Sequence, residues 1–255
     1  MLELYHSGLT TCSKQVWLCL REKGIDYVSR YIELWNYENL NPDYLKLNPN
    51  GVVPTLVHDG RAIFNSFVIM EFIEDLFPEI SLRPEDPNER ARMRLWTWTA
   101  DDVHPSITMI TYSNRLQDKI DDLSAEDQQI MLAHTPAPER QERWRRIVTG
   151  GYSEDEIRSS LDRIGFALDR AEAHLADGPW FAGSTYSLAD IAMLAIIHRY
   201  RELYPELIAP TDYPRISDWR DRMMARPAVA WVYSPDTEEV PGRPAGKSVA
   251  GIGVG

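Results

Sequence analysis

Cysteines are scarce in this chain of 255 residues, and long apolar runs are missing. The two thiols, Cys12 and Cys19, stand seven residues apart near the N-terminus and cannot form a disulfide framework. The apolar stretches fall far short of the ~20 residues that a membrane-spanning helix requires. The residues after Met1 show neither the basic nor the apolar stretch of a secretory signal peptide. We therefore expect a protein of the reducing cytoplasm.

Basic residues are also few in comparison with acidic ones. The sequence has 27 Lys and Arg against 39 Asp and Glu, which gives a net charge of −12. Phosphate backbones and anionic membrane surfaces repel such a chain, so we expect neither nucleic acid nor a membrane as a partner. Spacings typical of metal and nucleotide sites are missing too, because the sequence contains no CxxC, HExxH or GxGxxG motif. We expect no bound metal.

Residues 1–80 alternate between the patterns of strands and helices. β-Branched and aromatic residues predict short strands, and apolar residues at three- and four-residue steps predict two helices. The order is strand, helix, strand, followed by strand, strand, helix. The expected strands cover residues 2–5, 27–32, 52–57 and 62–64, and the expected helices run from about Thr11 to Gly24 and from Ser66 to the residue before Pro78.

The composition changes near residues 79–88, a charged, proline-containing stretch typical of a domain boundary. Beyond it no convincing strand is found, and apolar residues follow helical spacing to about residue 233. The last 22 residues, 234–255, contain five glycines and three prolines and cannot support a core. We therefore expect an α/β domain over residues 1–80, an all-helical domain over residues 89–233, and a flexible tail.

The loop from Gly8 to Lys14 is the first candidate for chemistry, because it leaves a strand and opens a helix. Backbone N–H groups and the helix dipole at such a position stabilise an anion, either a bound thiolate or the thiolate of Cys12. The alternative is purely structural: Thr11 or Ser13 caps the helix, and Cys12 is a small packed residue.

Two further features lie downstream. Val53-Pro54 falls inside a strand-like run, where proline is out of place unless the strand is at an edge or the peptide bond is cis. A cis bond would leave the N–H and C=O of Val53 free to pair with an extended peptide ligand. Asn65-Ser66 begins a helix, where it either holds a carboxylate or serves simply as a helix cap.

At this spacing the three features resemble the glutathione transferase superfamily. The resemblance covers about residues 2–232 and implies a thioredoxin-like α/β N-terminal domain followed by an all-α C-terminal domain. It also implies a homodimer in which the first domain of one chain meets the helical domain of the other. The motifs that carry the resemblance are Thr11-Cys12-Ser13, Leu20 to Gly24, Asn48 to Leu56, Asn65-Ser66, Tyr186 to Ile191 and Arg226-Pro227-Ala228.

The resemblance implies that glutathione is a co-substrate, and it assigns residues to this molecule. Val53 and Pro54 would take the cysteinyl backbone, and Asn65 with Ser66 the γ-glutamyl end. Asn39 is a further expected contact. Many relatives have Glu or Asp in place of Asn65, so the contact to the glutamyl ammonium would here be a neutral one.

The group that activates the thiol has four candidates. Alignment through Glu22-Lys23-Gly24 matches Ser13 to the serine of beta-etherases and Thr10 to the serine or cysteine of several other classes. Thr11 and Cys12 lie in the same loop and stay candidates. A reactive Cys12 would indicate a thiol reductase.

Within the superfamily, three segments resemble the bacterial beta-etherases of lignin breakdown: Met93 to Thr97, Pro136 to Glu139, and Trp144 to Arg146. This resemblance implies that the glutathione thiolate attacks an aromatic electrophile, a β-aryl ether, and expels a phenolate. The alternatives are a general glutathione transferase of detoxification, the Cys12-type reductase, and a non-catalytic protein that binds hydrophobic ligands.

A site for the electrophile is expected on the long helix after the domain boundary, facing the cleft between the domains. His104, Ile107 and Thr108 share one stripe at i, i+3, i+4 spacing, and they either line this site or pack against neighbouring helices. Trp96 and Trp98 stand two residues apart and cannot both face the cleft. One of them is expected to pack inward or to lie on a dimer face.

Overall fold

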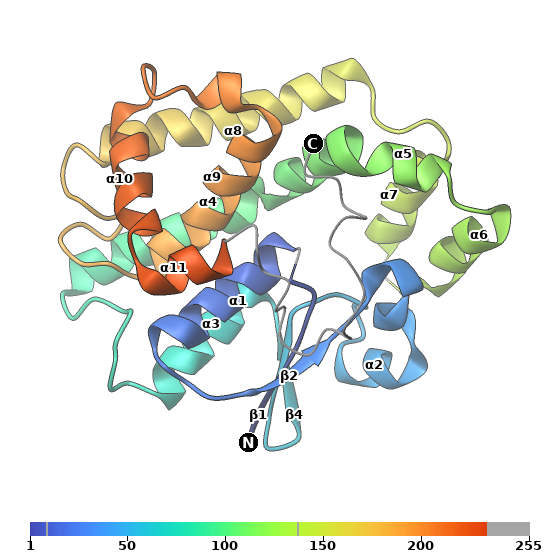
Figure 1. Cartoon of the computed structure of the whole chain (residues 1–255), viewed down its shortest axis with the longest axis horizontal. Coiled ribbons are helices and arrows are strands. Elements are labelled where there is room, and N and C mark those ends of the chain that lie inside the picture. Colours follow the sequence, from blue (N-terminus) through green and yellow to red (C-terminus); the bar gives the residue numbers. More distant parts are fainter. Residues whose placement is uncertain (9, 137, 234–255) are drawn as a thin grey trace.

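The N-terminal part of the chain forms a four-stranded mixed sheet with the strand order β2-β1-β3-β4 (Figure 1). β1 and β2 are parallel, whereas β1 pairs with β3, and β3 with β4, in antiparallel fashion. This computed structural model describes residues 1–8, 10–136 and 138–233, so the predicted tail lies outside the described residues. The strands are β1 (Leu2–His6), β2 (Val28–Tyr31), β3 (Thr55–His58) and β4 (Arg61–Phe64).

Strand β3 is shorter than the expected strand, which began at Val52. The carbonyl of Val52 accepts hydrogen bonds from Tyr44 Oη at 2.5 Å and from Asn48 Nδ2 at 2.9 Å. Pro54 has no N–H group to donate to a ladder. The strand therefore begins at Thr55, and the residues before it form a loop.

The helices of this domain begin at side-chain caps. Thr10 caps α1 by accepting a hydrogen bond from Ser13 N at 3.2 Å, and Asn65 caps α3 by accepting one from Phe67 N at 3.0 Å. Each cap satisfies a backbone donor that has no partner within the helix. The helices are α1 (Thr11–Glu22), α2 (Pro42–Leu47) and α3 (Ser66–Leu76), with short 3₁₀ turns η1 (Leu34–Asn36) and η2 (Glu38–Leu40).

Beyond residue 86 the described chain is helical, and its only β pairing is an isolated bridge between Trp180 and Gly183. The expected long helix ends at Thr111 and continues as a π-helical segment, η3. In the part of the chain that the structure describes, no helix is both long and apolar enough to cross a membrane. The elements are α4 (Pro87–Thr111), η3 (Tyr112–Leu116), α5 (Gln117–Asp121), α6 (Ala125–His134), α7 (Pro138–Val148), α8 (Glu154–His174), α9 (Leu188–Leu203), η4 (Pro205–Ile208), α10 (Pro214–Met224) and α11 (Pro227–Val232).

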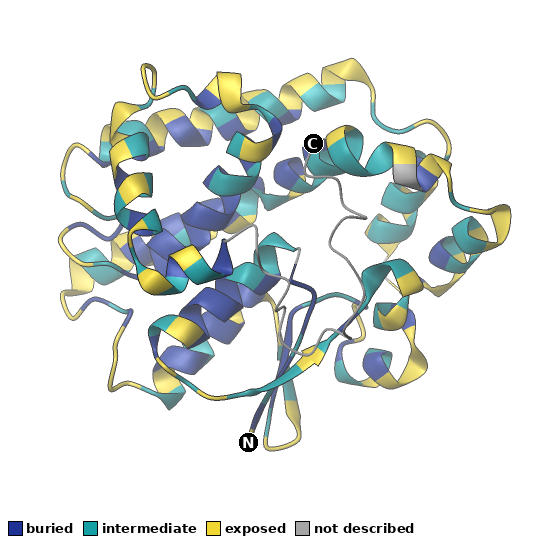
Figure 2. Ribbon diagram, viewed as in Figure 1, coloured by how far each residue is buried: buried dark blue, intermediate teal, exposed yellow. Residues whose placement is uncertain are grey.

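Helix α9 lies at the centre of the helical domain. Every residue from Leu188 to Ile197 is buried, and Figure 2 shows the buried residues gathered where α9, α4 and α1 meet. A helix that is buried all round needs partners on every side, and α9 packs on α4 and also on α1 of the first domain. The two domains therefore share one continuous core.

A buried ion pair fixes the connection between the domains. Lys23 Nζ lies 2.5 Å from Glu74 Oε1, and both side chains are only 1% exposed. The same carboxylate accepts a hydrogen bond from Leu82 N at 3.0 Å. A buried charge pair is tolerated only when its remaining polar groups are also satisfied, as they are here. The segment around Leu82 is thereby anchored to α1 and α3.

Asp190 closes the predicted capping box at the start of α9, which is confirmed. Its carboxylate is fully buried and accepts hydrogen bonds from Phe181 N at 3.0 Å, Trp219 Nε1 at 2.9 Å and Ser187 N at 2.9 Å. Burial raises the pKa of Asp190 to about 6, although these hydrogen bonds favour the charged form. The residue thus joins three segments of the helical domain through one acceptor group.

The first prediction concerns this acceptor. Asp190→Ala leaves three buried N–H donors without a partner, and we expect it to lower the free energy of unfolding by about 3 kcal/mol. Urea denaturation followed by circular dichroism measures the change. Asp177→Ala, at an exposed carboxylate of the loop between α8 and α9, is the control and should stay within about 0.5 kcal/mol of the parent. Equal stability of both variants would contradict the role of Asp190.

Candidate active site

Two domains meet at the N-terminus of α1. His104 Nε2, on α4, lies 3.3 Å from Cys12 Sγ and 3.2 Å from Thr11 Oγ1. The residues are more than 90 positions apart in the sequence, and they meet because α1 and α4 both pack on α9. Of the four candidates for activation, Thr11 and Cys12 are therefore the two that contact His104.

The Cys12–His104 contact changes the acidity of both groups. Burial acts to raise the pKa of the Cys12 thiol, but the charge and hydrogen bond of His104, with hydroxyls of Ser66 and Thr11, bring it below its ordinary value. The opposite charge of the Cys12 thiolate likewise raises the pKa of His104 against the effect of burial. Proximity of opposite charges favours both charged forms. The arrangement supports a thiolate next to an imidazolium.

Ser13 and Thr10 form a second pair, which bonds to Ser7 and not to Cys12 or His104 among the described residues. Thr10 Oγ1 donates a hydrogen bond to Ser13 Oγ at 2.7 Å, and Ser13 Oγ also accepts one from Ser7 N at 3.3 Å. Ser13 is fully buried, whereas Thr10 is half-buried. Of the two hydroxyls that alignment favours, Thr10 is the one nearer to the surface.

The loop before β3 carries the cis peptide bond that the sequence predicted at Val53-Pro54. Asn39 Nδ2 donates to Gly51 O at 2.9 Å and holds the start of this loop. No side chain or backbone group of the described residues hydrogen-bonds to the N–H or C=O of Val53. That edge is consequently open to an extended ligand.

Asn65 and Ser66 lie at the start of α3. Asn65 has a positive φ of 72° and uses its Oδ1 atom to cap the helix, while its amide Nδ2 has no partner among the described residues. Ser66 is buried and donates to Gln15 Oε1 at 2.7 Å. Since its hydroxyl also favours the Cys12 thiolate, Ser66 connects the α3 N-terminus to the α1 N-terminus.

The three residues of the stripe predicted on α4, His104, Ile107 and Thr108, do not all lie at the site. His104 reaches α1, and Thr108 is half-buried, with its hydroxyl donating to His104 O at 2.9 Å. Ile107 is 1% exposed and belongs to the hydrophobic core, so the structure does not bring it to the surface at which His104 lies. The two tryptophans also separate as expected, because Trp96 is buried and Trp98 is 61% exposed.

Residues missed in the sequence hold this site together. The sequence assigns no role in the site to Gln15 or Tyr44, and it gives Asn48 only as the first residue of the motif that ends at Leu56. Tyr44 Oη and Asn48 Nδ2 both bond to Thr55 Oγ1, at 2.9 and 3.0 Å. A polar residue at a buried position of an apolar helix face, such as Gln15, is the sequence signal that would have pointed to such a network.

Comparison with known proteins gives matches over most of the chain. The model of the glutathione S-transferase N-terminal domain matches residues 11–76, and the model of the C-terminal domain matches residues 126–227. The expected fold, a thioredoxin-like domain followed by an all-α domain, is confirmed.

Similar proteins come from Sphingobium. Protein LigF of Sphingobium sp. (strain NBRC 103272 / SYK-6) is 31% identical over 245 residues, which cover 93% of this chain and 95% of that protein. The crystal structure of the beta-etherase LigF from strain SYK-6 has a TM-score of 0.85 at 30% identity and covers 91% of this chain and 98% of that one. A tetrachloro-p-hydroquinone reductive dehalogenase of Sphingobium chlorophenolicum is 29% identical over 235 residues, or 88% of this chain and 92% of that protein.

The second prediction tests the electrostatics at Cys12. Because His104 favours the thiolate, the pH midpoint for alkylation of Cys12 by iodoacetamide should lie below the ~8.5 of a free cysteine. In His104→Gln the midpoint should rise. Mass spectrometry of the labelled peptide measures the alkylation rate of Cys12 at each pH in both proteins. Cys19, which is fully buried, serves as the unreactive internal control. An identical midpoint in the two proteins would contradict the pairing.

Proposed function

The chain belongs to the glutathione S-transferase family, and we propose that it activates the glutathione thiol for attack on an aromatic electrophile. The reaction we propose is cleavage of β-aryl ethers in lignin-derived compounds. One observation carries the proposal: the register of β1, β3 and β4 puts the loop before α1, the open edge at Val53 and the start of α3 at the same end of the sheet, and His104 of the helical domain contacts α1 there. A glutathione-dependent enzyme of this kind would work in the cytoplasm.

Glutathione is a short peptide, and we expect it to bind where the α1 N-terminus, the Val53 edge and the α3 N-terminus come together. The free N–H and C=O of Val53, beside Pro54, would pair with its cysteinyl backbone. Its γ-glutamyl end would lie at Asn65 and Ser66, where the α3 N-terminus favours a carboxylate. Asn39 would act by holding Gly51 and so the shape of the loop. The thiol would then lie at the N-terminus of α1.

Activation of the thiol is an electrostatic task. A free thiol has a pKa near ~8.5, and a decrease of ~2 units stabilises the thiolate by roughly 2.7 kcal/mol. Helix α1 directs its N-terminal N–H groups at this position, and Thr10 is the hydroxyl within reach, with Ser13 behind it. We propose that the O–H of Thr10, which donates to Ser13 Oγ in this structure, turns to the thiolate, and that Ser13 then donates to Thr10 Oγ1 and holds it in place.

The activated sulfur then displaces an aryloxide. The thiolate attacks the carbon that bears the ether oxygen, a C–S bond forms, and the C–O bond breaks with its electron pair leaving on the phenolate. Positioning and thiolate activation supply most of the rate in such a displacement. The similarity to a beta-etherase along nearly the whole chain supports this reaction above a general detoxifying transferase.

A second candidate function is favoured by the Cys12–His104 contact. A stabilised Cys12 thiolate can attack the glutathionyl sulfur of a substrate mixed disulfide, so that the substrate thiolate leaves and a Cys12–glutathione disulfide forms. A glutathione thiolate would then attack this disulfide, which releases the Cys12 thiolate and forms oxidised glutathione. This chemistry makes the protein a thiol reductase and needs Cys12 rather than a hydroxyl.

The third prediction separates these functions. With glutathione and a β-aryl ether ketone, Ser13→Ala and Thr10→Val should each lower kcat about 10- to 100-fold and leave glutathione affinity nearly unchanged, because only the charged state loses support. The double variant should lose little more, since the two hydroxyls form one unit. Initial rates and equilibrium binding measure the effects.

Cys12→Ser is the matched control for that experiment. If the protein is a transferase that uses a hydroxyl, the Cys12→Ser variant should keep its ether-cleaving activity. Loss of all activity in Cys12→Ser, together with a quantitative Cys12–glutathione adduct by mass spectrometry, would establish the reductase instead. A chlorinated aromatic tested in parallel shows whether turnover is restricted to ethers.

We also propose that the protein is a homodimer. Large apolar side chains are exposed on both domains: Phe64 and Val68 on the first, Leu95 and Trp98 on α4. Val68 is 55% exposed and Leu95 62%, values that are unfavourable on a monomer surface. A two-fold axis that places the first domain of one chain against α4 of the other would cover both sets.

The fourth prediction follows from these surfaces. Light scattering at micromolar concentration should give twice the mass of one chain. Val68→Arg should shift the mass to that of a monomer, because it would bury an unpaired charge at the contact. Leu207→Arg, at an exposed position of η4, should remain dimeric. A monomeric parent protein would refute the proposal.

A further inference from the structure

One face of helix α7 is directed at the candidate site. Arg140, Arg143, Trp144 and Ile147 follow i, i+3, i+4, i+7 spacing and therefore share that face. Ile147 is fully buried, and the other three are half-buried. This face is the one that α7 turns toward the rest of the protein.

Ring contact fixes the C-terminal half of α7. The ring of Trp144 packs edge-on against the ring of Tyr112, with centroids 5.2 Å apart and an interplanar angle of 81°. Tyr112 stands two helical turns beyond His104 on the same stripe of α4 and η3, with Thr108 between them. The α7 face therefore lies along the stripe that begins at His104.

The N-terminal end of α7 is fixed at the opposite side of the site. Pro136, just before the helix, packs so closely on Gly51 that a Cβ atom on this glycine would lie 3.3 Å from Pro136 Cδ. Gly51 has a positive φ of 60° and stands two residues before Val53. Helix α7 thus runs from the loop with the open Val53 edge to the aromatic pair at Tyr112, and Arg140 and Arg143 lie between.

These two arginines have no acidic partner. No carboxylate of the described residues lies within 4.0 Å of either guanidinium, and neither makes a hydrogen bond to described residues. The neighbouring arginines on the other faces differ, since Arg145 pairs with Glu142 and Arg146 with Glu156. Burial, and then the charge of Arg143, lower the pKa of Arg140. Two like charges are therefore held together, partly desolvated, without a counterion.

The phenol hydroxyl of Tyr112 is a third donor beside the two arginines. The hydroxyl of Tyr112 has no hydrogen-bond partner among the described residues, and burial raises the pKa of this group, so it stays a donor. Arg143 acts electrostatically on both Tyr112 and His104, which places its charge next to the stripe. Unpartnered, partly buried donors of this kind favour an anionic oxygen.

We propose that Arg140, Arg143 and Tyr112 form a subsite for an anionic oxygen on the aromatic second substrate. This inference rests on the proposed function and names the substrate class that the site would accept. Trp144 and Tyr112 supply the aromatic contact, and the two guanidinium groups supply the charge.

The anionic oxygen has two sources on such a substrate. One is a carboxylate carried by the ring throughout the reaction. The other is the phenolate that forms when the C–O bond breaks and its electron pair leaves on oxygen. Guanidinium groups stabilise either anion, the first in the ground state and the second chiefly in the transition state.

The fifth prediction is a binding experiment that needs no turnover. 4-Nitrobenzoate should bind the parent protein about ten-fold or more tightly than the neutral 4-nitrobenzamide, measured by calorimetry in the presence of glutathione. Arg140→Gln and Arg143→Gln should each reduce this preference about ten-fold. Arg145→Gln, the same charge change on the exposed face of the helix, is the control and should keep it.

Several outcomes overturn the subsite. These are the absence of a preference for the benzoate in the parent protein, an equal preference in all four proteins, and an effect of both substitutions on glutathione affinity alone. The last result would assign the arginines to a glutathione carboxylate. Because binding is measured directly, a protein that shows the benzoate preference but cleaves no ether contradicts the proposed function and leaves the subsite standing.

Kinetics then identify the source of the anion. If the carboxylate is bound, the arginine variants lower kcat/KM for 4-chloro-3,5-dinitrobenzoate about ten-fold but not for its methyl ester. If the phenolate is stabilised, kcat for a series of β-aryl ethers depends more strongly on the acidity of the leaving phenol in the arginine variants than in the parent protein. Either pattern supports the subsite.

Discussion

The geometry of the site depends on how α1 is held between the two domains. Gln15, buried in the middle of the interface, donates through Nε2 to Ala192 O on α9 at 3.2 Å and accepts through Oε1 from Ser66 on α3. At the other end of the helix, Glu22 accepts two hydrogen bonds from Arg226, at 2.7 and 2.8 Å. A buried amide with both ends satisfied tolerates little displacement, because any shift leaves a desolvated polar atom unpaired. Sheet domain, helical domain and α1 therefore behave as one body.

This constraint explains why the candidate site lies where the two domains meet. Cys12 and Thr11 begin α1, and His104 lies on α4, so their 3.2–3.3 Å contacts are correct only if α1 and α4 keep their relative position. Ser66, which bonds to Gln15, transmits the same constraint to the start of α3. Reacting groups must be held to within a fraction of an ångström. The polar contacts that join the domains consequently determine the site as well as the fold.

Local features of the structure could be predicted from the sequence, and distant ones could not. The strands of the first domain, the cis bond at Val53-Pro54 and the capping box at Ser187 each depend on a few consecutive residues with specific backbone preferences. The contact between Cys12 and His104 depends on helix packing across 92 positions, which no local pattern encodes.

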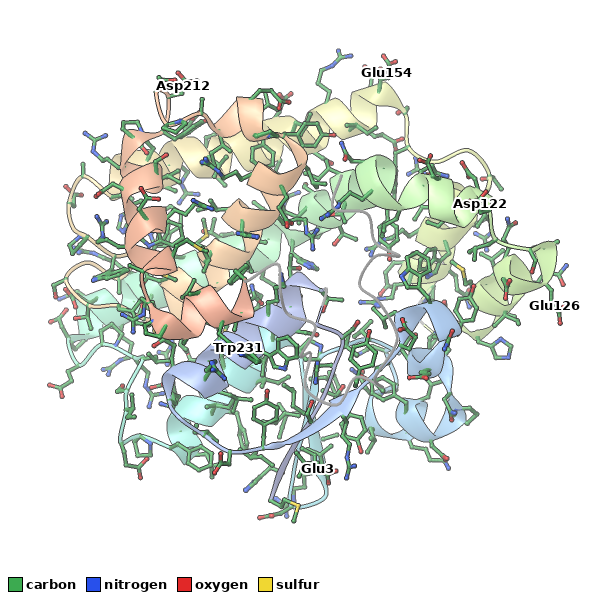
Figure 3. All side chains as sticks on the ribbon, in the orientation of Figure 1. Glu3, Asp122, Glu126, Glu154, Asp212 and Trp231 are labelled. Atoms are coloured by element: carbon green, nitrogen blue, oxygen red, sulfur yellow. The ribbon has the colours of Figure 1, made fainter. Side chains whose placement is uncertain are left out.

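The burial of a side chain is another property that the spacing of residues in the sequence does not determine. A hydroxyl in a helix's first turn either faces outward or folds back on the cap, and the bond from Thr10 Oγ1 fixes Ser13 in the second arrangement. The net charge of −12 misleads in a similar way. The exposed carboxylates labelled in Figure 3, Asp122, Glu126 and Glu154 among them, lie at the periphery. At physiological salt their field fades within about 8 Å, whereas partly buried guanidinium groups are screened much less. A negative net charge is therefore compatible with a site for a small anion at a partly buried pair of arginines.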